Sequence, residues 1–331
     1  LFAAWTVSAA AAETVYLDAA HGSDANSGRS AGAALATLDA AIGAAKDGGK
    51  IILLSDYTIR THYTEPQHTG EIVITAKDGT RDTGAKLIFN VTGETHYRLS
   101  GATTFRDLDI TLKNFVMFTA QFHNLTFDTG LTVEGGEKYA FVIGGYQTAF
   151  PEDMELGLDS HVTIKSGKYH AVAGSSRGAS SIMFEGTSHI TVDGGEINML
   201  FGGSINGSGM ANAEITINGG TINQLNMAGD ATRRINGDAT LTVNGGMIGQ
   251  LAVNNVMGHA IVNYNGGQIA TATKSIEDKI MEFVTDGTAT LNVNPDLNAA
   301  MVALAFDTVN YVGKTPATTE PAKTTEPAKT T

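Results

Sequence analysis

The sequence contains no cysteine, and it has few charged residues for its length. A chain without thiols forms no disulfide, thiolate zinc site or iron–sulfur cluster, and it offers no cysteine nucleophile. Charged residues make up 17 %, against a usual ~25 %, and the formal net charge is −13. This acidic balance argues against nucleic acid and anionic membranes as partners, because both are bound through lysine and arginine. No segment approaches the ~18 apolar residues of a membrane-spanning helix, so we expect no membrane insertion.

Glycine, by contrast, is abundant, with 39 of 331 residues or about 12 %, against a usual ~7 %. This frequency argues against helical bundles, since glycine is a poor helix former. Much of it recurs in segments where an alternating strand is followed by two small residues. These segments are LTVEGG from Leu131, VTIKSG from Val162, ITVDGG from Ile190, ITINGG from Ile215, LTVNGG from Leu241 and VNYNGG from Val262. Their final glycines are separated by 31, 28, 25, 26 and 21 residues.

Each copy alternates apolar and polar side chains and then bends. Apolar residues stand five and three positions before the final glycine, usually with threonine between them, which indicates a strand with one buried face. In most copies, apolar residues also stand two and five positions after the glycine, so a second short strand is expected there. One unit cannot bury its apolar side alone, but a stack of units can. The sequence therefore predicts an all-β solenoid of roughly ten coils between Ile51 and Val293, about 50 Å long.

One turn position of the repeat carries asparagine in three consecutive copies, at Asn218, Asn244 and Asn265. In a stack, identical side chains at one position lie above one another, and amide groups then hydrogen-bond along the stack. We therefore expect a structural ladder of asparagine side chains. A ligand-binding role for these residues is the alternative.

The ends of the chain differ from the repeat in composition. Residues 1–12 (LFAAWTVSAAAA) are apolar and end in small residues, which is typical of the back half of a secretory signal peptide. Residues 13–50 are expected to cap the solenoid, with a short helix near 35–45 covering its open first coil. The parallel β-helix is expected over 51–314. Residues 315–331 contain TTEPAK twice and predict a disordered linker.

The N-terminal part of this arrangement resembles a known group of proteins. VYLDAAHGSDANSG from Val15 and ATLDAAIGAAKDGGKIILLSDYTI from Ala36 resemble the start of secreted right-handed parallel β-helix proteins of the pectate-lyase-like superfamily. The Gly-Gly repeat is similar to that of surface proteins from anaerobic Gram-positive bacteria. The resemblance covers about residues 13–300, and it implies a right-handed parallel β-helix with a short N-terminal capping helix. It implies little about function, because this fold carries lyases, hydrolases, adhesins and inert stalks.

No catalytic constellation is evident, and catalytic residues stay unknown at this stage. Glycoside hydrolases of the superfamily carry Asn-Thr-Asp, Asp-Asp and Gly-His-Gly motifs, and none of the three occurs in this sequence. Its lyases use calcium-binding aspartates with an arginine or lysine base, whereas the basic residues between positions 131 and 269 do not recur at one repeat position. Proton abstraction and glycosidic cleavage both need such groups gathered in one pocket. These observations argue against an enzyme without excluding one.

Binding residues are expected along one edge of the solenoid, where the longer loops leave the stack. Tyr139, Tyr146 and Tyr169 are candidates for stacking on sugar rings. Arg177, Arg233 and Arg234 are the cationic candidates, and the alternative is that they pair with surface carboxylates. The partner expected at this edge is an extracellular polysaccharide or a host or cell-surface glycan.

Metal ligands are only weakly indicated. Asp24 and Asn26 alternate as the oxygen ligands of a calcium loop do, but no later bidentate glutamate follows, and a hydrogen-bonded turn is the competing interpretation. The histidines at 123, 161, 170 and 189 show no close metal-ligand spacing along the chain, so each is expected at the surface or in a turn. No other cofactor is expected.

Together these features favour a secreted or cell-surface β-helix that acts as a non-catalytic adhesive, glycan-contacting or spacer module. Further modules or a wall anchor are expected beyond the C-terminal linker. The alternative is a polysaccharide lyase or glycoside hydrolase acting on an extracellular glycan along the loop edge.

Overall fold

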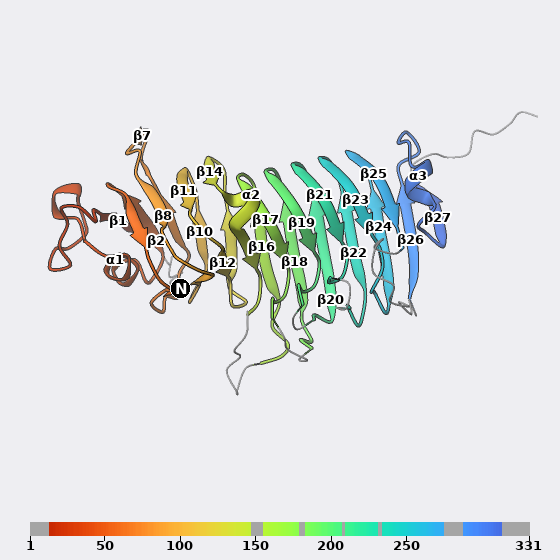
Figure 1. The fold of residues 1–331 in the computed structure, drawn as a ribbon, viewed down its shortest axis with the longest axis horizontal. Helices are drawn as coiled ribbons and strands as arrows, with labels where there is room; N and C mark the ends of the chain where they lie inside the picture. Colours follow the sequence, from red (N-terminus) through yellow and green to blue (C-terminus); the bar gives the residue numbers. More distant parts are fainter. Residues whose placement is uncertain are drawn as a thin grey trace, which may run out of the picture.

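Parallel strands follow one another along a single axis, so that sequence order is also spatial order (Figure 1). A computed structural model describes residues 13–146, 155–178, 183–206, 209–230, 234–274 and 287–312. The segments 1–12 and 315–331, for which a signal peptide and a linker were predicted, lie outside the described residues, as does Arg233. The predicted parallel β-helix is confirmed.

The longest sheet, which we call sheet A, has 12 strands among the described residues, and every pairing in it is parallel. Its strands are β1 (Glu13–Leu17), β2 (Gly49–Leu53), β5 (Ile72–Thr75), β10 (Thr103–Phe105), β13 (Asn124–Phe127), β16 (Ser160–Ile164), β18 (Thr187–Val192), β20 (Asn212–Ile217), β22 (Ala239–Val243), β24 (His259–Tyr264), β26 (Thr288–Val293) and β27 (Thr308–Tyr311).

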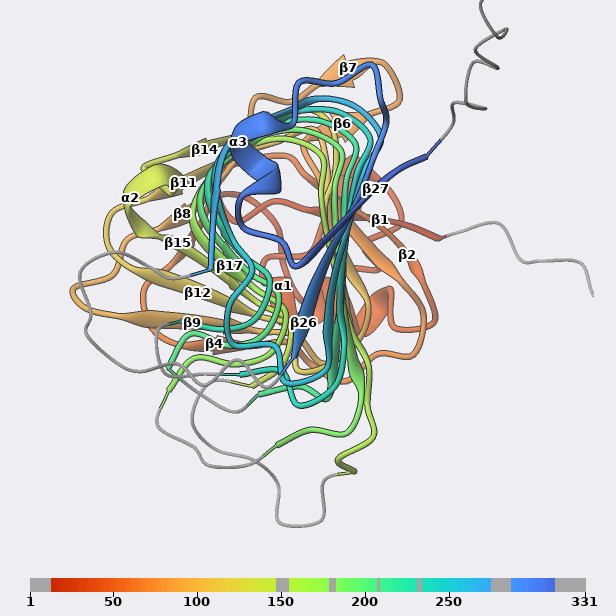
Figure 2. The ribbon, with the colours of Figure 1, turned by 90° about the vertical axis from the view of Figure 1, so that its right-hand side faces the viewer.

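A second sheet, sheet C, has nine described strands and lies across the interior from sheet A (Figure 2). Its strands are β4 (Tyr63–Thr64), β9 (Thr95–Arg98), β12 (Val116–Thr119), β15 (Ala140–Ile143), β17 (Lys168–Ala173), β19 (Glu196–Phe201), β21 (Thr221–Asn226), β23 (Met247–Ala252) and β25 (Gln268–Thr273). The two predicted strands of each repeat are thus one strand of sheet A and one of sheet C.

A third sheet, sheet B, is present only in the N-terminal half of the stack. It comprises β3 (Tyr57–Ile59), β8 (Lys86–Phe89), β11 (Leu108–Leu112) and β14 (Leu131–Glu134). Among the described residues, no strand after β14 belongs to sheet B. A hairpin of two short antiparallel strands, β6 (Lys77–Asp78) and β7 (Arg81–Asp82), projects beside it. The solenoid therefore has three faces up to β14 and two faces afterwards, a change that the repeat did not predict.

The interior is a continuous column of apolar side chains. In sheet A, Val162, Ile190, Ile215, Leu241 and Val262 are register neighbours in successive strands, and all are almost inaccessible to solvent. Burying such a side chain contributes about 1.5–3 kcal/mol before the entropy of ordering is subtracted. Each coil packs such residues against those of its two neighbours. Every coil is therefore stabilised by the coils on either side of it.

The bends between the sheets follow the prediction in the C-terminal half. The final glycines of five copies have positive φ angles, at Gly167, Gly195, Gly220, Gly246 and Gly267. The asparagine ladder is also present. Its amides donate from Asn218 to Asp193 at 2.8 Å, from Asn244 to Asn218 at 2.8 Å and from Asn265 to Asn244 at 2.9 Å.

The first predicted copy was aligned wrongly. Leu131 lies in β14 and pairs with Leu108 of β11 in sheet B, so it is not equivalent to Val162. The true neighbour of Val162 in sheet A is Leu125 of β13, which stands six residues before Leu131. The misalignment arose because β14 has the same alternation and is also followed by two glycines. Here the first glycine of the pair, Gly135, has the positive φ.

Short helices lie at both ends and at the step between the two halves. The helix α1 (Leu38–Ala44) confirms the predicted N-terminal cap and buries Leu38 and Ile42 against the first coils. The strand β1 precedes α1 and already belongs to sheet A, so the stack begins within the segment expected to be only a cap. The helix α3 (Ala300–Ala303) lies at the opposite end (Figure 1), and α2 (Gly136–Tyr139) follows β14. A 3-10 turn spans Ala31–Ala33. Among the described residues, no helix has the length and apolar character needed to cross a membrane.

Candidate functional site

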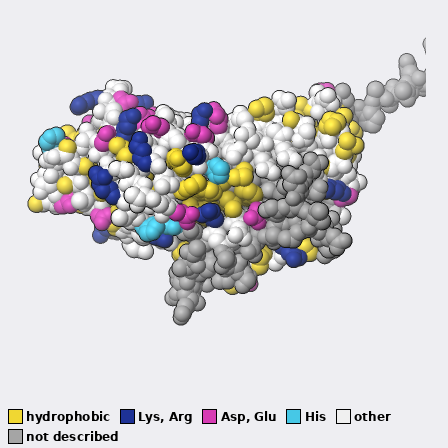
Figure 3. Space-filling model, viewed as in Figure 1, with side chains coloured by type: hydrophobic (Ala, Val, Ile, Leu, Met, Phe, Trp, Pro, Cys, Tyr) yellow, Lys and Arg dark blue, Asp and Glu magenta, His cyan; other side chains and the backbone are white. Residues whose placement is uncertain are grey.

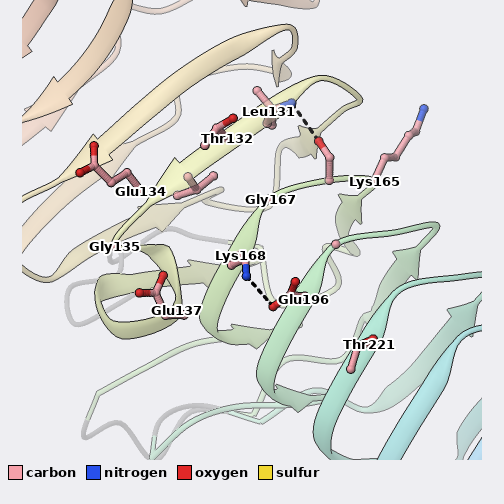
Figure 4. A pocket seen from close by; sticks show the side chains of 13 residues that line it. Leu131, Thr132, Glu134, Gly135, Glu137, Lys165, Gly167, Lys168, Glu196 and Thr221 are labelled. Atoms are coloured by element: carbon pink, nitrogen blue, oxygen red, sulfur yellow. Dashed lines mark hydrogen bonds and ion pairs between the residues drawn. The ribbon is translucent and has the colours of Figure 1, made fainter.

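An open groove of about 810 Å³ lies at the step where sheet B ends (Figure 4). One side is formed by β14 and the start of α2, and the other by the bends that lead into β17, β19 and β21. Its lining comprises Leu131, Thr132, Val133, Glu134, Gly135, Glu137, Lys165, Ser166, Gly167, Lys168, Gly195, Glu196 and Thr221. The groove exists because the next coil places a bend where another strand of sheet B would otherwise lie.

The wall of this groove is the free edge of β14. At one end of the strand, the backbone N–H of Leu131 donates to Ser166 Oγ at 3.1 Å, so this donor is satisfied by the following bend. After the strand, Gly136 passes so close to the next coil that a Cβ there would overlap the carbonyl oxygen of Lys168. These two contacts hold the strand edge and the bend in a fixed relation.

The charged side chains of the groove other than Glu137 have partners, either one another or residues of the adjacent coil. Lys168 Nζ lies 2.9 Å from Glu196 Oε2 across one rung of sheet C, and Lys165 Nζ lies 3.2 Å from Asp128 Oδ1. Glu134 accepts a hydrogen bond from Thr111 Oγ1 at 3.1 Å. The hydrogen bond and the charge of Glu196 raise the pKa of Lys168. A lysine that acts as a general base needs the opposite shift, because only the neutral amine accepts a proton.

An aromatic patch borders the groove at α2 and consists of Phe115, Tyr139 and Phe141. The ring of Phe115 meets Tyr139 at 5.4 Å and Phe141 at 5.9 Å between centroids. Phe115 is 39 % exposed, which is unusual for phenylalanine in a protein whose other rings are mostly buried. Lys138 Nζ lies 5.0 Å from the Tyr139 ring. The patch therefore presents aromatic surface next to hydrogen-bonding groups.

The patch continues onto the outer face of sheet C. Met117, Phe141 and Ala171 form an apolar cluster separate from the interior, and the partly buried Met199 and Ile205 pack against it. Figure 3 shows hydrophobic side chains gathered near the middle of the stack on the face drawn there. An apolar outer face is the exception in a solenoid whose outward positions are mostly polar.

Arg177 is joined to this surface. Its guanidinium carbon lies 4.7 Å from the centroid of the Phe141 ring, and Nη1 lies 3.0 Å from Glu94 Oε2. The alternative that Arg177 pairs with a surface carboxylate is thus what the structure shows. Arg177 is thus linked to Tyr139 through the rings of Phe141 and Phe115.

Of the other predicted binding residues, the three that the structure describes do not line the groove. Tyr169 is completely buried in the interior and donates from its hydroxyl to the Ser166 carbonyl at 2.9 Å, so a ligand outside the stack cannot contact its ring. This corrects its assignment as a stacking residue. Tyr146 is half-buried beside Phe122, with ring centroids 5.9 Å apart. Arg234 is exposed, and its Nη1 lies 3.6 Å from Met257 Sδ.

The candidate calcium residues take part in a hydrogen-bonded turn. Asp24 Oδ1 accepts the backbone N–H groups of Ala36 and Thr37 at 2.9 Å each, and Oδ2 accepts the Thr37 hydroxyl at 2.8 Å. Asn26 donates from Nδ2 to the Ala34 carbonyl at 2.9 Å. These contacts tie the loop to the start of α1, which agrees with the turn interpretation.

A buried carboxylate elsewhere also serves the fold. Glu65 is 3 % exposed, and it accepts hydrogen bonds from the Tyr97 hydroxyl at 2.8 Å and from Thr103 Oγ1 at 3.0 Å. Its Oε2 lies 3.1 Å from His68 Nε2. With several partners and almost no exposure to solvent, Glu65 is placed to join coils.

Of the aromatic patch, the sequence reasoning identified only Tyr139, although a signal for the rest was present. The segments VMFT of β12 and AFVI of β15 are apolar at consecutive positions, which means that both faces of sheet C are covered there.

Comparison of the chain with protein-family models, curated proteins and solved structures finds no match.

Proposed function

We propose that this protein is a β-helical module that binds an extended glycan at the groove and the aromatic patch, without chemical conversion of it. The observation that carries the proposal is the exposed ring of Phe115 beside a groove walled by paired polar side chains. Sugars present apolar C–H faces and hydroxyl groups together, so they suit a surface where an aromatic ring adjoins hydrogen-bonding groups.

The charge arrangement supports binding over catalysis. Lys168 and Lys165 are each held by a carboxylate, and Arg177 is held by Glu94 and Phe141. Such cations orient a neutral or weakly acidic ligand, but they are poorly prepared to remove a proton from it. A lyase or glycosidase would need a free base or a carboxylic acid of raised pKa in contact with the substrate.

We further propose that the module works outside the cell, as an adhesive element or as a spacer attached to a surface. This part rests on the composition of residues 1–12 and on the repeated TTEPAK of 315–331. The stacked strands between these segments would hold the groove at a fixed distance from whatever the linker joins.

A binding assay combined with product analysis tests the proposal. The purified chain is applied to an array of neutral and acidic polysaccharides, and the same polysaccharides are analysed for shortened or unsaturated products. We expect retention of at least one glycan with no product. The double variant Phe115→Ala, Tyr139→Ala should lose retention, whereas Tyr311→Ala, which removes a 65 % exposed ring at the far end, should keep it.

Three outcomes would contradict the proposal. Release of glycan products by the unaltered chain would show an enzyme instead. Equal retention by the unaltered chain and the double variant would show that the groove is not the binding surface, and binding of no glycan would remove the proposed ligand class.

A further inference from the structure

Two histidines stack on the outer side of sheet A, on a different sheet from the strand that walls the groove. His161 of β16 and His189 of β18 are register partners in adjacent parallel strands. Their ring centroids lie 4.6 Å apart, and their planes differ by 4°. Strand spacing of ~4.8 Å explains this separation, because equivalent side chains in a parallel stack point the same way. The two imidazoles are 28 residues apart in sequence and adjacent in space.

Carboxylates stand on both sides of this pair. Asp159 Oδ2 lies 4.0 Å from His189 Nε2, and Glu214 Oε2 lies 3.1 Å from His189 Nδ1. Asp159 is itself oriented, because its Oδ1 accepts the backbone N–H of Thr187 at 2.7 Å. One nitrogen or oxygen from each of Asp159, His161 and His189 can be chosen so that all three atoms lie within 4.8 Å of one another.

We propose that Asp159, His161 and His189 bind a divalent transition-metal ion of the zinc type, with Glu214 orienting His189. Two imidazoles and one carboxylate are a ligand set that Zn²⁺ accepts in tetrahedral geometry with a fourth position left open. Bonds of about 2.0–2.2 Å require the three ligand atoms to draw closer together. The half-exposed side chains of Asp159 and His161 can make this adjustment by small rotations.

The contact with Glu214 is the detail that distinguishes this cluster from a chance pairing. A metal-binding histidine commonly donates its other ring N–H to a carboxylate, which fixes the tautomer that leaves the metal-binding nitrogen free. In this site Nδ1 of His189 faces Glu214, while Nε2 faces Asp159. The second nitrogen is thus held toward Asp159.

The test uses the full chain without a histidine tag, titrated with ZnCl₂ in a calorimeter, and with CoCl₂ to record the visible absorption that reports tetrahedral coordination. We expect one ion per chain, and weaker binding at lower pH, because protons compete with the metal for imidazole nitrogen. His161→Ala and His189→Ala should each abolish the calorimetric signal. Glu214→Gln should weaken binding about ten-fold, since it disturbs only the orienting contact.

His259→Ala is the matched control. His259 lies on the same face of sheet A, and its Nδ1 is 3.2 Å from Asp238 Oδ1, but no second imidazole adjoins it. This variant should bind Zn²⁺ as the unaltered chain does. Circular dichroism of each variant checks that the β-structure is retained, and Asp159→Asn provides a ligand change that keeps an acceptor for Thr187. Undiminished binding by the double variant His161→Ala, His189→Ala, or no binding by the unaltered chain, would overturn the proposal.

Discussion

Arg177 lies over the ring of Phe141, with its guanidinium carbon 4.7 Å from the ring centroid, while its Nη1 reaches Glu94 at 3.0 Å. One side chain thereby joins a loop after β17 to the outer surface of sheet C. We expect Arg177→Ala to lower the free energy of unfolding by about 1 kcal/mol, through loss of the ring contact and the ion pair. Arg177→Lys should give an intermediate value, because lysine keeps the charge but not the planar contact. Urea unfolding measures both, and equal stability of all three proteins would contradict this role.

The asparagine ladder should contribute to stability in proportion to its hydrogen bonds. Asn244→Ala removes the donor to Asn218 and the acceptor for Asn265. We expect a loss of about 1–2 kcal/mol, because each net hydrogen bond contributes about 0.5–1.5 kcal/mol and these side chains are exposed. Thr240→Ala, in the same coil, is the control and should change little. A thermal or urea midpoint that moves equally in both variants would argue against the ladder.

The bends depend on glycine at positions of positive φ. Gly220 has φ of 80°, and a Cβ there would lie 2.7 Å from the carbonyl oxygen of Gly195 in the preceding coil. We expect Gly220→Ala to destabilise the protein by more than about 1 kcal/mol, since the residue must adopt a left-handed conformation against a close contact.

Gly43→Ala provides the opposite control. Gly43 lies within α1, and no atom lies within 4 Å of a Cβ built there. This variant should gain about 0.4–1 kcal/mol through better helix propensity. A stabilising effect of both substitutions, measured by unfolding, would contradict the proposed geometry of the bend.

Stability should fall on mild acidification because of His96. Burial, and then the charges of Arg98 and His62, lower the pKa of His96 to about 4. In the unfolded chain its pKa is about 6.5, so the unfolded state binds more protons between these values. The contribution of His96 is therefore fully present above about pH 6.5 and is lost as the pH falls toward 4.

His96→Gln should flatten this dependence, and unfolding measured at pH 7, 6 and 5 would reveal it. The contribution of His68 to stability should depend on pH in the opposite direction. Burial opposes its protonation, but the hydrogen bonds with Glu65 and the Gly70 carbonyl prevail and raise its pKa. Its contribution is present below about pH 6.5 and is lost as the pH rises through the raised value. An unchanged pH dependence in His96→Gln would refute the assignment of the acid-sensitive group.

The repeat of the C-terminal half could be predicted from the sequence because burial constrains it at every coil. Ile197, Ile222 and Ile248 stand two residues after their glycines, and the structure pairs them in register. When the apolar residues of every coil stand at fixed distances from a glycine, neighbouring coils can be aligned in only one way. The same reasoning failed at Leu131, because β14 carries an equivalent pattern but belongs to another sheet.

Features on the outer surface were harder to predict, since outward residues are not constrained by burial. Phe115 lies in a connection before β12, and its neighbour Tyr139 lies in a helix, so no periodicity links them. The stacked histidines could have been found. His161 and His189 each precede the first apolar residue of a recognised copy by one position, but a search for close spacing along the chain does not compare copies.

The loops that lead from sheet C back to sheet A would allow the solenoid to be lengthened one coil at a time. Successive final glycines from 167 to 267 are 28, 25, 26 and 21 residues apart, yet the strands and bends remain in register. Differences in length are therefore absorbed by these loops. Duplication of one whole unit would reproduce the same ladder, bend and interior contacts on both of its sides. Tandem duplication could thus lengthen the protein in steps of one coil, while a single inserted residue between Asn244 and Gly246 would displace the ladder from the bend.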